Sequence, residues 1–202
     1  MKGPSRGLAP IDAASAAGAS VGVGRGAIIT TFFGFAWFGW GLGYAQVFSP
    51  LPWIALYACA IALFVFSIRA ERRGGALLTK RAPGGSDFWP RVAKRFYLVL
   101  LLEFVLCGVA VALVYAYHRE DLLAAGISFA VGLHFLPLGS VFRFSAYYVT
   151  GSAMVVCAVV SAMLFRAETI TLAVGLASGT VLWLTSIYAL VRADFFARIA
   201  EA

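Results

Sequence analysis

Charged side chains are scarce in this chain of 202 residues. Asp, Glu, Lys and Arg make up 12% of it, against about 25% in an ordinary soluble protein. Hydrophobic residues make up 62%, and the mean hydropathy is +0.90. A water-soluble domain of this size could not cover so much apolar surface with so few polar residues. The composition therefore excludes a soluble globular domain and predicts a membrane protein, with the lipid bilayer as its main partner.

Cysteine and histidine are also rare. The cysteines Cys59, Cys107 and Cys157 are odd in number, lie inside apolar runs and match no metal-binding spacing. The set His118–Asp121 lies in one short turn and is too contiguous to converge on a metal ion. The net charge of +7 comes from basic residues between apolar runs, a placement typical of cytoplasmic loops near anionic headgroups. We therefore predict no metal site and no nucleic-acid partner, and the sequence indicates no particular cofactor.

Long apolar runs are what the sequence does contain. Six of them have about the 20 residues that a hydrocarbon core of about 30 Å requires. Lipid offers the backbone no hydrogen-bond partners, and the runs lack the alternation of barrel strands, so each is expected to be a helix. The predicted spans are 27–48, 52–69, 96–117, 121–139, 145–165 and 169–192. The predicted organisation is an all-α transmembrane bundle over 27–192, a flexible tail at 1–26, a mobile basic linker at 70–95 and a second tail at 193–202.

Basic residues lie almost entirely on one side of the predicted spans. Fourteen of the sixteen Lys and Arg residues lie in the two tails, in the linker, in the connection at Arg143 or at the adjoining span ends, Arg69 and Arg192. Arg119 and Arg166 are the two exceptions. By the positive-inside rule, both termini and the linker are expected in the cytoplasm, and the chain is expected to be a multi-pass protein of the inner (plasma) membrane.

Short echoes relate the first three spans to the last three. Cys59-Ala60 and Arg69-Ala70-Glu71 resemble Cys157-Ala158 and Arg166-Ala167-Glu168. Two halves of three spans would have opposite orientations, as in many transporters, so one interpretation is a weak 3+3 inverted repeat. Chance matches within a small apolar alphabet are the other interpretation.

Glu103 lies deep inside the third apolar run. A carboxyl group at that depth costs about 2.5–3.5 kcal/mol on insertion scales, so it must face protein or water. His134 lies in the fourth run, three residues before Pro137, whose missing N–H frees the carbonyl of Leu133. Helical rise places Glu103 about 10 Å and His134 about 8 Å from the cytoplasmic ends of their spans. We therefore expect the two side chains to point into the bundle and approach each other, directly or through one water.

Hydroxyl side chains are expected at the same level in the fifth and sixth spans. They are Tyr148, Thr150, Thr185 and Ser186. Together with Glu103 and His134 they are our candidate ligand- or proton-binding residues, around a pocket that faces the cytoplasm. The alternative for the carboxyl, the imidazole and the hydroxyls alike is a structural hydrogen bond between helices.

Two further features bear on packing. The pairs Gly39 with Gly43 and Gly175 with Gly179 have the small-xxx-small spacing of closely packed membrane helices. Pro137 is expected to bend or end the fourth helix, because its ring costs a hydrogen bond.

Two segments resemble known sequences. Residues 132–138 read Gly-Leu-His-Phe-Leu-Pro-Leu, and residues 147–151 read Tyr-Tyr-Val-Thr-Gly. Both are similar to segments of uncharacterised bacterial six-span membrane proteins. The resemblance covers a minority of the chain and implies no activity.

Three functions remain open at this point. The first is binding or translocation of a small molecule or ion, with Glu103 and His134 as a proton-linked pair. The second is a small intramembrane enzyme that acts on a lipid, with Glu103 as acid or base. The third is a non-catalytic membrane scaffold or subunit, and the oligomeric state is open in each case. No nucleophile with its base is evident, since Ser178 follows both histidines whereas the serine of rhomboid proteases precedes its histidine.

Overall fold

The fold is built only from helices in the part of the chain that the structure describes. This computed structural model describes residues 12–81 and 88–202, without the side chains of 88–92. The helices are α1 (Ala13–Tyr44), α2 (Pro50–Arg81), α3 (Phe88–Ala116), α4 (Leu123–Phe142), α5 (Ala146–Leu164) and α6 (Ala167–Glu201), with a short 3₁₀ turn, η1 (Glu120–Leu122). All six helices contain a stretch long and apolar enough to cross a membrane. The predicted all-α class with six spans is confirmed, and the chain is a multi-pass membrane protein.

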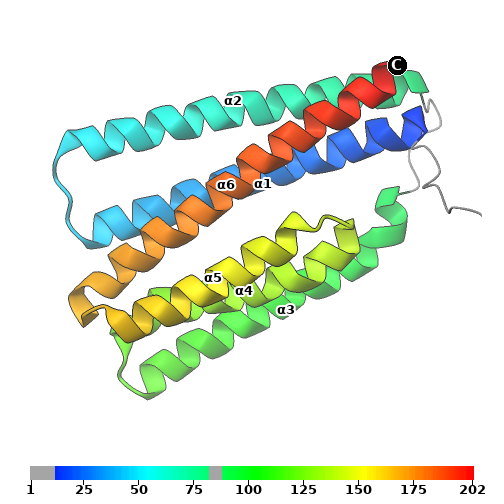
Figure 1. Cartoon of the computed structure of the whole chain (residues 1–202). Coiled ribbons are helices and arrows are strands. Elements are labelled where there is room, and N and C mark those ends of the chain that lie inside the picture. Colours follow the sequence, from blue (N-terminus) through cyan, green and yellow to red (C-terminus); the bar gives the residue numbers. More distant parts are fainter. Residues whose placement is uncertain (1–11, 82–87) are drawn as a thin grey trace, which may run out of the picture.

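Successive helices run in opposite directions, so the start of α1 and the end of α6 lie at the same end of the molecule (Figure 1). We call this end the tail side. The short turns between α1 and α2, α3 and α4, and α5 and α6 lie at the other end, the far side. Arg143, with a φ of 52°, closes α4 at the tail side in the left-handed conformation that commonly caps a helix.

Helix ends on the tail side differ from the sequence prediction. α1 begins at Ala13, inside the predicted tail 1–26, because the Asp12 carboxylate accepts a hydrogen bond of 2.8 Å from the Ser15 N–H and caps the helix. The same hydrogen bond holds the pKa of Asp12 below its ordinary value of 3.8. Most of the predicted second tail is also helical, up to Glu201. Residues 1–11 of the first tail lie outside the described residues.

The predicted linker 70–95 is likewise helical over most of its length. α2 continues to Arg81 and α3 starts at Phe88, while residues 82–87 lie outside the described residues. At about 1.5 Å per residue, the 32, 32 and 35 residues of α1, α2 and α6 reach about 50 Å. That exceeds the roughly 30 Å of a hydrocarbon core, so these three helices protrude from it together.

Small residues hold this protruding part together, which we call the three-helix extension. Ala16, Ala17 and Ala200 form a fully buried cluster, against which Leu77 and Leu78 pack. The glycine and serine residues interspersed in this stretch are weak helix formers, and this packing stabilises the helices there. From composition alone, such a stretch looks like a flexible tail. This is why the predicted tail-side ends of α1, α2 and α6 are wrong.

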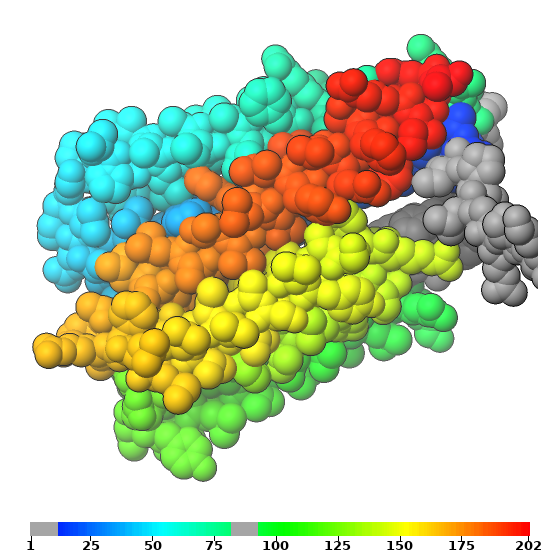
Figure 2. Space-filling model, viewed as in Figure 1, coloured from blue at the N-terminus to red at the C-terminus, as the bar shows by residue number. Residues whose placement is uncertain are grey.

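The six helices form two groups, and α6 connects them. α1, α2 and α6 pack together, and α3, α4 and α5 pack together, while α6 also contacts α4 and α5 (Figures 1 and 2). Each group thus takes two helices from one half of the sequence and the third from the other half. A repeat whose third helices are exchanged would give this arrangement, and the inverted repeat stays a prediction.

The α1–α6 contact depends on glycine. A Cβ atom on Gly175 would lie 2.7 Å from the Cα of Gly41, and one on Gly34 would lie 2.3 Å from the Trp183 ring. The expected role of Gly175 and Gly179 in a packing seam is confirmed. The expectation for Gly39 and Gly43 is wrong, since a Cβ on either would meet open space. Both pairs have the same spacing, but only one of them faces the neighbouring helix.

α4 continues through Pro137 to Phe142, so the helix does not end at the proline, and the alternative, a bend there, stays a prediction. Pro137 has no N–H to donate to the carbonyl of Leu133, four residues before it. That carbonyl belongs to the residue next to His134 and is free of its usual helical partner. The Ser140 hydroxyl donates to the Pro137 carbonyl at 2.8 Å.

Candidate functional site

Glu103 lies on the face of α3 that packs against α4. Along α3, the more buried positions recur every three to four residues, from Val99 through Glu103 and Ala110 to Val114. This is the periodicity of a helix with one packed face. Gly126 of α4 lies against Ala110 and Val114 and lets the two helices approach. The carboxyl group therefore points toward the bundle, as the sequence predicted.

His134 meets Glu103 across this contact. Its Nε2 lies 3.6 Å from the Glu103 Oε2. That distance is too long for a hydrogen bond, and it is within the range of an ion pair when the imidazole is protonated and the carboxyl ionised. The predicted approach of the two side chains is confirmed. The prediction used only the rise per residue of a helix, which places both residues at a similar depth in the membrane.

Neither member of the pair is fully satisfied by the protein. The His134 side chain is 9% exposed, and its Nδ1 is buried with no hydrogen-bond partner among the described residues. The Glu103 side chain is 21% exposed, and His134 is its one ion-pair partner among the described side chains. Buried polar groups in folded proteins are nearly always hydrogen-bonded, so an open imidazole nitrogen beside a carboxyl group marks a place for a further partner.

Aromatic rings close the tail side of the pair. Phe135, Phe142, Phe144 and Tyr147 pack with ring centroids 5.0–6.2 Å apart, and Phe96 of α3 joins Phe142 at 5.8 Å. We call these five residues the aromatic cluster. The sequence interpretation placed a pocket on this side, and in the structure rings fill it. The Glu103 side chain is 21% exposed, and Phe104, next to it on α3, is 69% exposed.

The predicted hydroxyl residues form bridges between helices. Thr150 of α5 and Thr185 of α6 share a hydrogen bond of 2.6 Å, in which one hydroxyl donates to the other. The accepting hydroxyl in turn donates to a carbonyl of its own helix, that of Ala146 or of Val181. Ser186 hydrogen-bonds Thr31 of α1 at 2.7 Å and reaches the Ala27 carbonyl at 3.1 Å. All these hydroxyls are buried and satisfied. The structure thus places Thr150, Thr185 and Ser186 in the packing of α6, away from the α3–α4 contact.

Tyr148 does not point into the bundle. Its side chain is 44% exposed, and its ring covers Gly139 from the outside. The preceding residue, Tyr147, is the buried one, within the aromatic cluster and with its hydroxyl against Gly26 of α1. One residue along a helix turns a side chain by about 100°, so depth alone does not tell which of the two tyrosines is buried. The recurrence of buried Tyr147, Thr150, Met154 and Ala158 is the signal that identifies the right face.

One polar contact in the bundle was not predicted. Ser128 of α4 and Ser178 of α6 share a hydrogen bond of 2.8 Å and are fully buried. Among the described residues, the hydrogen-bond partner of Ser178 is therefore a second serine. With Thr185 and Ser186, this contact means that α6 is joined by side-chain hydroxyls to α4, α5 and α1 in turn.

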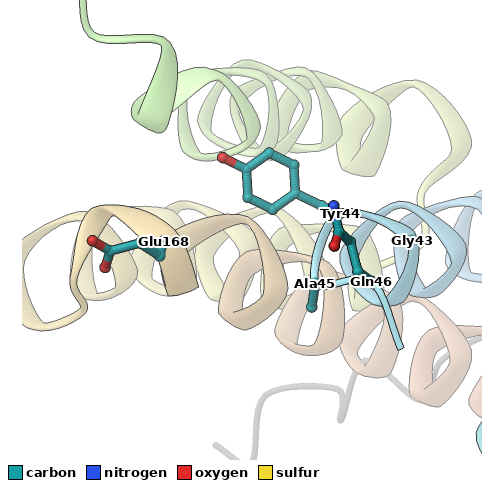
Figure 3. A pocket seen from close by; sticks show the side chains of 5 residues that line it. All are labelled: Gly43, Tyr44, Ala45, Gln46 and Glu168. Carbon is teal, nitrogen blue, oxygen red and sulfur yellow. The ribbon is translucent and has the colours of Figure 1, made fainter. Parts of the chain in front are cut away.

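An open depression lies on the far side and is separate from the pair. It has a volume of about 650 Å³ and is lined by the end of α1, the turn after it and Glu168 of α6 (Figure 3). Five residues line it, and four of them are consecutive, Gly43–Gln46. Within the described ranges, no group of three or more His, Cys, Asp or Glu side chains is arranged to hold a metal ion.

No family model, curated protein or solved structure matches this chain. The interpretation of the site rests on its own geometry. A carboxyl and an imidazole 3.6 Å apart can hold one proton between them, pass it to a partner, or accept a cation in its place.

Proposed function

We propose that this membrane protein binds a small molecule or ion of positive charge at Glu103 and His134, in exchange for a proton. The observation that carries the proposal is the half-satisfied pair: a carboxyl oxygen 3.6 Å from Nε2, and a buried Nδ1 without a described partner. The Thr31–Ser186 and Thr150–Thr185 contacts, by comparison, are complete hydrogen bonds. The carboxyl and the open imidazole nitrogen can therefore bind a ligand, whereas the hydroxyls already have partners.

The exchange follows from charge. With one proton, the pair is neutral overall, as acid plus imidazole or as carboxylate plus imidazolium. Without that proton it carries one negative charge, which is costly in a medium of low dielectric constant. A cation beside the carboxylate removes that cost, so binding of one monovalent cation releases one proton. The carbonyl of Leu133, freed by Pro137, adds an acceptor on the same turn of α4.

Proton release on binding is the direct test. The full-length protein in nanodiscs of zwitterionic lipid is placed in weak buffer with a pH indicator, and Na⁺, K⁺ or ethylammonium is added. We expect about one proton per chain for one of these probes, from the charge argument, and none for Glu103→Gln. The control is Glu120→Gln, which removes an exposed carboxyl in η1 and is expected to leave the release unchanged.

Two results would refute the proposal: equal proton release from the parent and from Glu103→Gln, or no release from the parent with any of the three probes. Thr150→Val is an internal check. Thr150 bridges α5 and α6, so this variant is expected to release protons like the parent.

A second candidate function is supported by the exposure of Glu103 toward the flank of α3. A lipid approaching between exposed apolar side chains such as Leu102 and Phe104 would reach the carboxyl group sideways, which suits an acid or base that acts on a lipid. Incubation with a mixed phospholipid extract, followed by mass spectrometry, separates the two functions. A product that requires Glu103 supports the enzyme, and unchanged lipid together with proton release supports the binding protein.

We further propose that the tail side faces the cytoplasm. The support is the excess of Lys and Arg at that end. Single cysteines at Ser49 on the far side and Thr79 near the end of α2, in a chain whose own cysteines are replaced, test this in intact cells. An impermeant thiol reagent is expected to label the Ser49 variant only, and labelling of Thr79 alone would reverse the orientation.

A further inference from the structure

A second site lies away from the pair, in a groove between α2 and α6. The groove has a volume of about 270 Å³. Its larger lining residues are Phe66, Arg69 and Arg73 of α2 with Leu190 and Asp194 of α6, and the rest of its wall consists of small side chains. Small residues on both helices form the floor of the groove, and the longer side chains form its edges.

The groove crosses the membrane boundary on the tail side. Phe66 and Leu190 belong to the apolar runs, and Arg69 is the charged residue that ends the run of α2. Arg73 lies one turn further, about 6 Å along the axis at 1.5 Å per residue. The lining therefore changes from apolar to basic along the membrane normal, in the order in which a phospholipid changes from acyl chain to phosphate.

The two arginines differ in what they already bind. Arg73 is held by the carboxylates of Asp194 at 2.6 Å and Glu201 at 2.9 Å. Arg69 has no acidic partner within the described ranges, and its side chain is exposed at the rim of the groove. Asp194 is also bound by Arg198 at 2.8 Å. These three arginines and two carboxylates leave one uncompensated positive charge, on Arg69.

We propose that this groove binds an anionic phospholipid, with its phosphate on the Arg69 guanidinium and one acyl chain along Phe66 and Leu190. Guanidinium groups bind phosphate oxygens in a planar, two-point geometry, which favours Arg over Lys here. The excess positive charge favours a lipid with net negative charge over a zwitterionic one. A groove of this volume fits a headgroup and the start of a chain, and it is too small for a partner helix.

Lipid binding by the full-length protein tests the proposal. The protein in a non-ionic detergent is titrated with phosphatidylglycerol or phosphatidylcholine, and bound lipid is counted by native mass spectrometry. We expect tighter binding of phosphatidylglycerol, and a loss of about fivefold in that affinity for Arg69→Gln, the size expected for one basic side chain near an anionic headgroup. Arg69→Lys is expected to keep part of the affinity.

Arg72→Gln is the matched control. Arg72 is exposed on the same helix, carries the same charge and does not line the groove. Equal losses for Arg69→Gln and Arg72→Gln would show general surface attraction and overturn the site. Equal binding of the two lipids by the parent would do the same.

Inorganic phosphate separates a lipid from a soluble phosphate. At millimolar concentration it is expected not to displace phosphatidylglycerol, since it cannot use the apolar wall of Phe66 and Leu190. Displacement by inorganic phosphate alone would show that the groove binds a free phosphate compound and would refute the lipid assignment.

Discussion

The α1–α6 contact and the α3–α4 contact use polar residues in opposite ways. Between α1 and α6, Thr31, Ser186 and the Ala27 carbonyl form a closed set of hydrogen bonds, and Gly41 and Gly175 bring the backbones together. Between α3 and α4, Glu103 and His134 approach without a hydrogen bond and leave Nδ1 open. Both sets lie inside the apolar spans, so depth does not distinguish them.

Satisfaction of hydrogen bonds is what distinguishes the two contacts. Hydroxyl groups that bond one another and a nearby carbonyl hold helices together and have no capacity left for a ligand. A carboxyl and an imidazole that are only partly satisfied cost stability, and such costs are characteristic of functional sites. The comparison therefore predicts that changes in the first contact affect folding and that changes in the second affect binding.

The largest effect is expected from glycine in the α1–α6 seam. In Gly175→Ala the new methyl group would lie 2.7 Å from the Gly41 Cα, and backbone cannot move aside cheaply. Overpacking of this kind costs about 1–3 kcal/mol. The measurement is the midpoint of thermal unfolding in detergent. Gly39→Ala is the control, since its methyl group would meet open space and alanine favours a helix over glycine by about 1 kcal/mol.

A lower midpoint for Gly175→Ala with an unchanged or higher one for Gly39→Ala supports the seam. Equal shifts for the two variants would contradict it, because both have the same intrinsic preference and differ only in what the methyl group meets.

The next effect is expected from the hydroxyl bridge. In Ser186→Ala the Thr31 hydroxyl loses its 2.7 Å partner while still buried, which costs about 1–3 kcal/mol for an unsatisfied group. Thr31→Val with Ser186→Ala removes both partners and is expected to cost less than the sum of the two single changes. The coupling energy, measured as a double-mutant cycle by unfolding, is expected near 0.6 kcal/mol, as for other membrane hydrogen bonds. A coupling energy of zero would show that the Thr31–Ser186 hydrogen bond does not stabilise the fold.

The sequence predicted the spans better than it predicted the ends of the helices. Hydropathy identifies a span because the thickness of lipid fixes its length. The three-helix extension is helical for another reason, the packing of Ala16, Ala17 and Ala200, and no local pattern reports a contact between residues so far apart. The Glu103–His134 approach was predictable because cost and depth together restrict both side chains.

Depth says nothing about the direction of a side chain around its helix. Tyr148 and Tyr147 have nearly the same depth, and only the second is buried. Gly39 and Gly41 differ in the same way. The closed hydrogen bonds of Thr150, Thr185 and Ser186 depend on which helices are neighbours, and the sequence alone does not provide that.

A smaller effect on stability is expected from Glu103→Gln. Replacement of a partly buried carboxyl by a neutral amide of the same shape removes a cost of burial and a weak interaction together. We expect the free energy of unfolding to change by about 1 kcal/mol or less, which is the common range for such exchanges, while proton release is lost. The melting curve and the pH-indicator assay are measured on one preparation. A loss of unfolding free energy as large as that of Gly175→Ala would show that the pair is structural, and would contradict the contrast between the two contacts.

The smallest effect is expected at acid pH in the three-helix extension. Hydrogen bonds from Arg198 and Arg73 hold the pKa of Asp194 below its ordinary 3.8, and those from Arg73 hold the pKa of Glu201 below its ordinary 4.5. A carboxylate with a lowered pKa stabilises the fold above its ordinary value, and this contribution disappears as the pH falls through the lowered value. Because these side chains are nearly half exposed, water and salt screen the pairs and the change is small.

Thermal unfolding measured between pH 6 and pH 3 tests this. The unfolding midpoint is expected to fall less with pH for Arg73→Gln than for the parent, and the difference between the two is expected to be still smaller in high salt. Arg72→Gln, which has no described carboxylate partner, is expected to follow the parent. Identical pH slopes for the parent and Arg73→Gln would mean that packing of small residues, without the ion pairs, holds α2 and α6 together beyond the membrane.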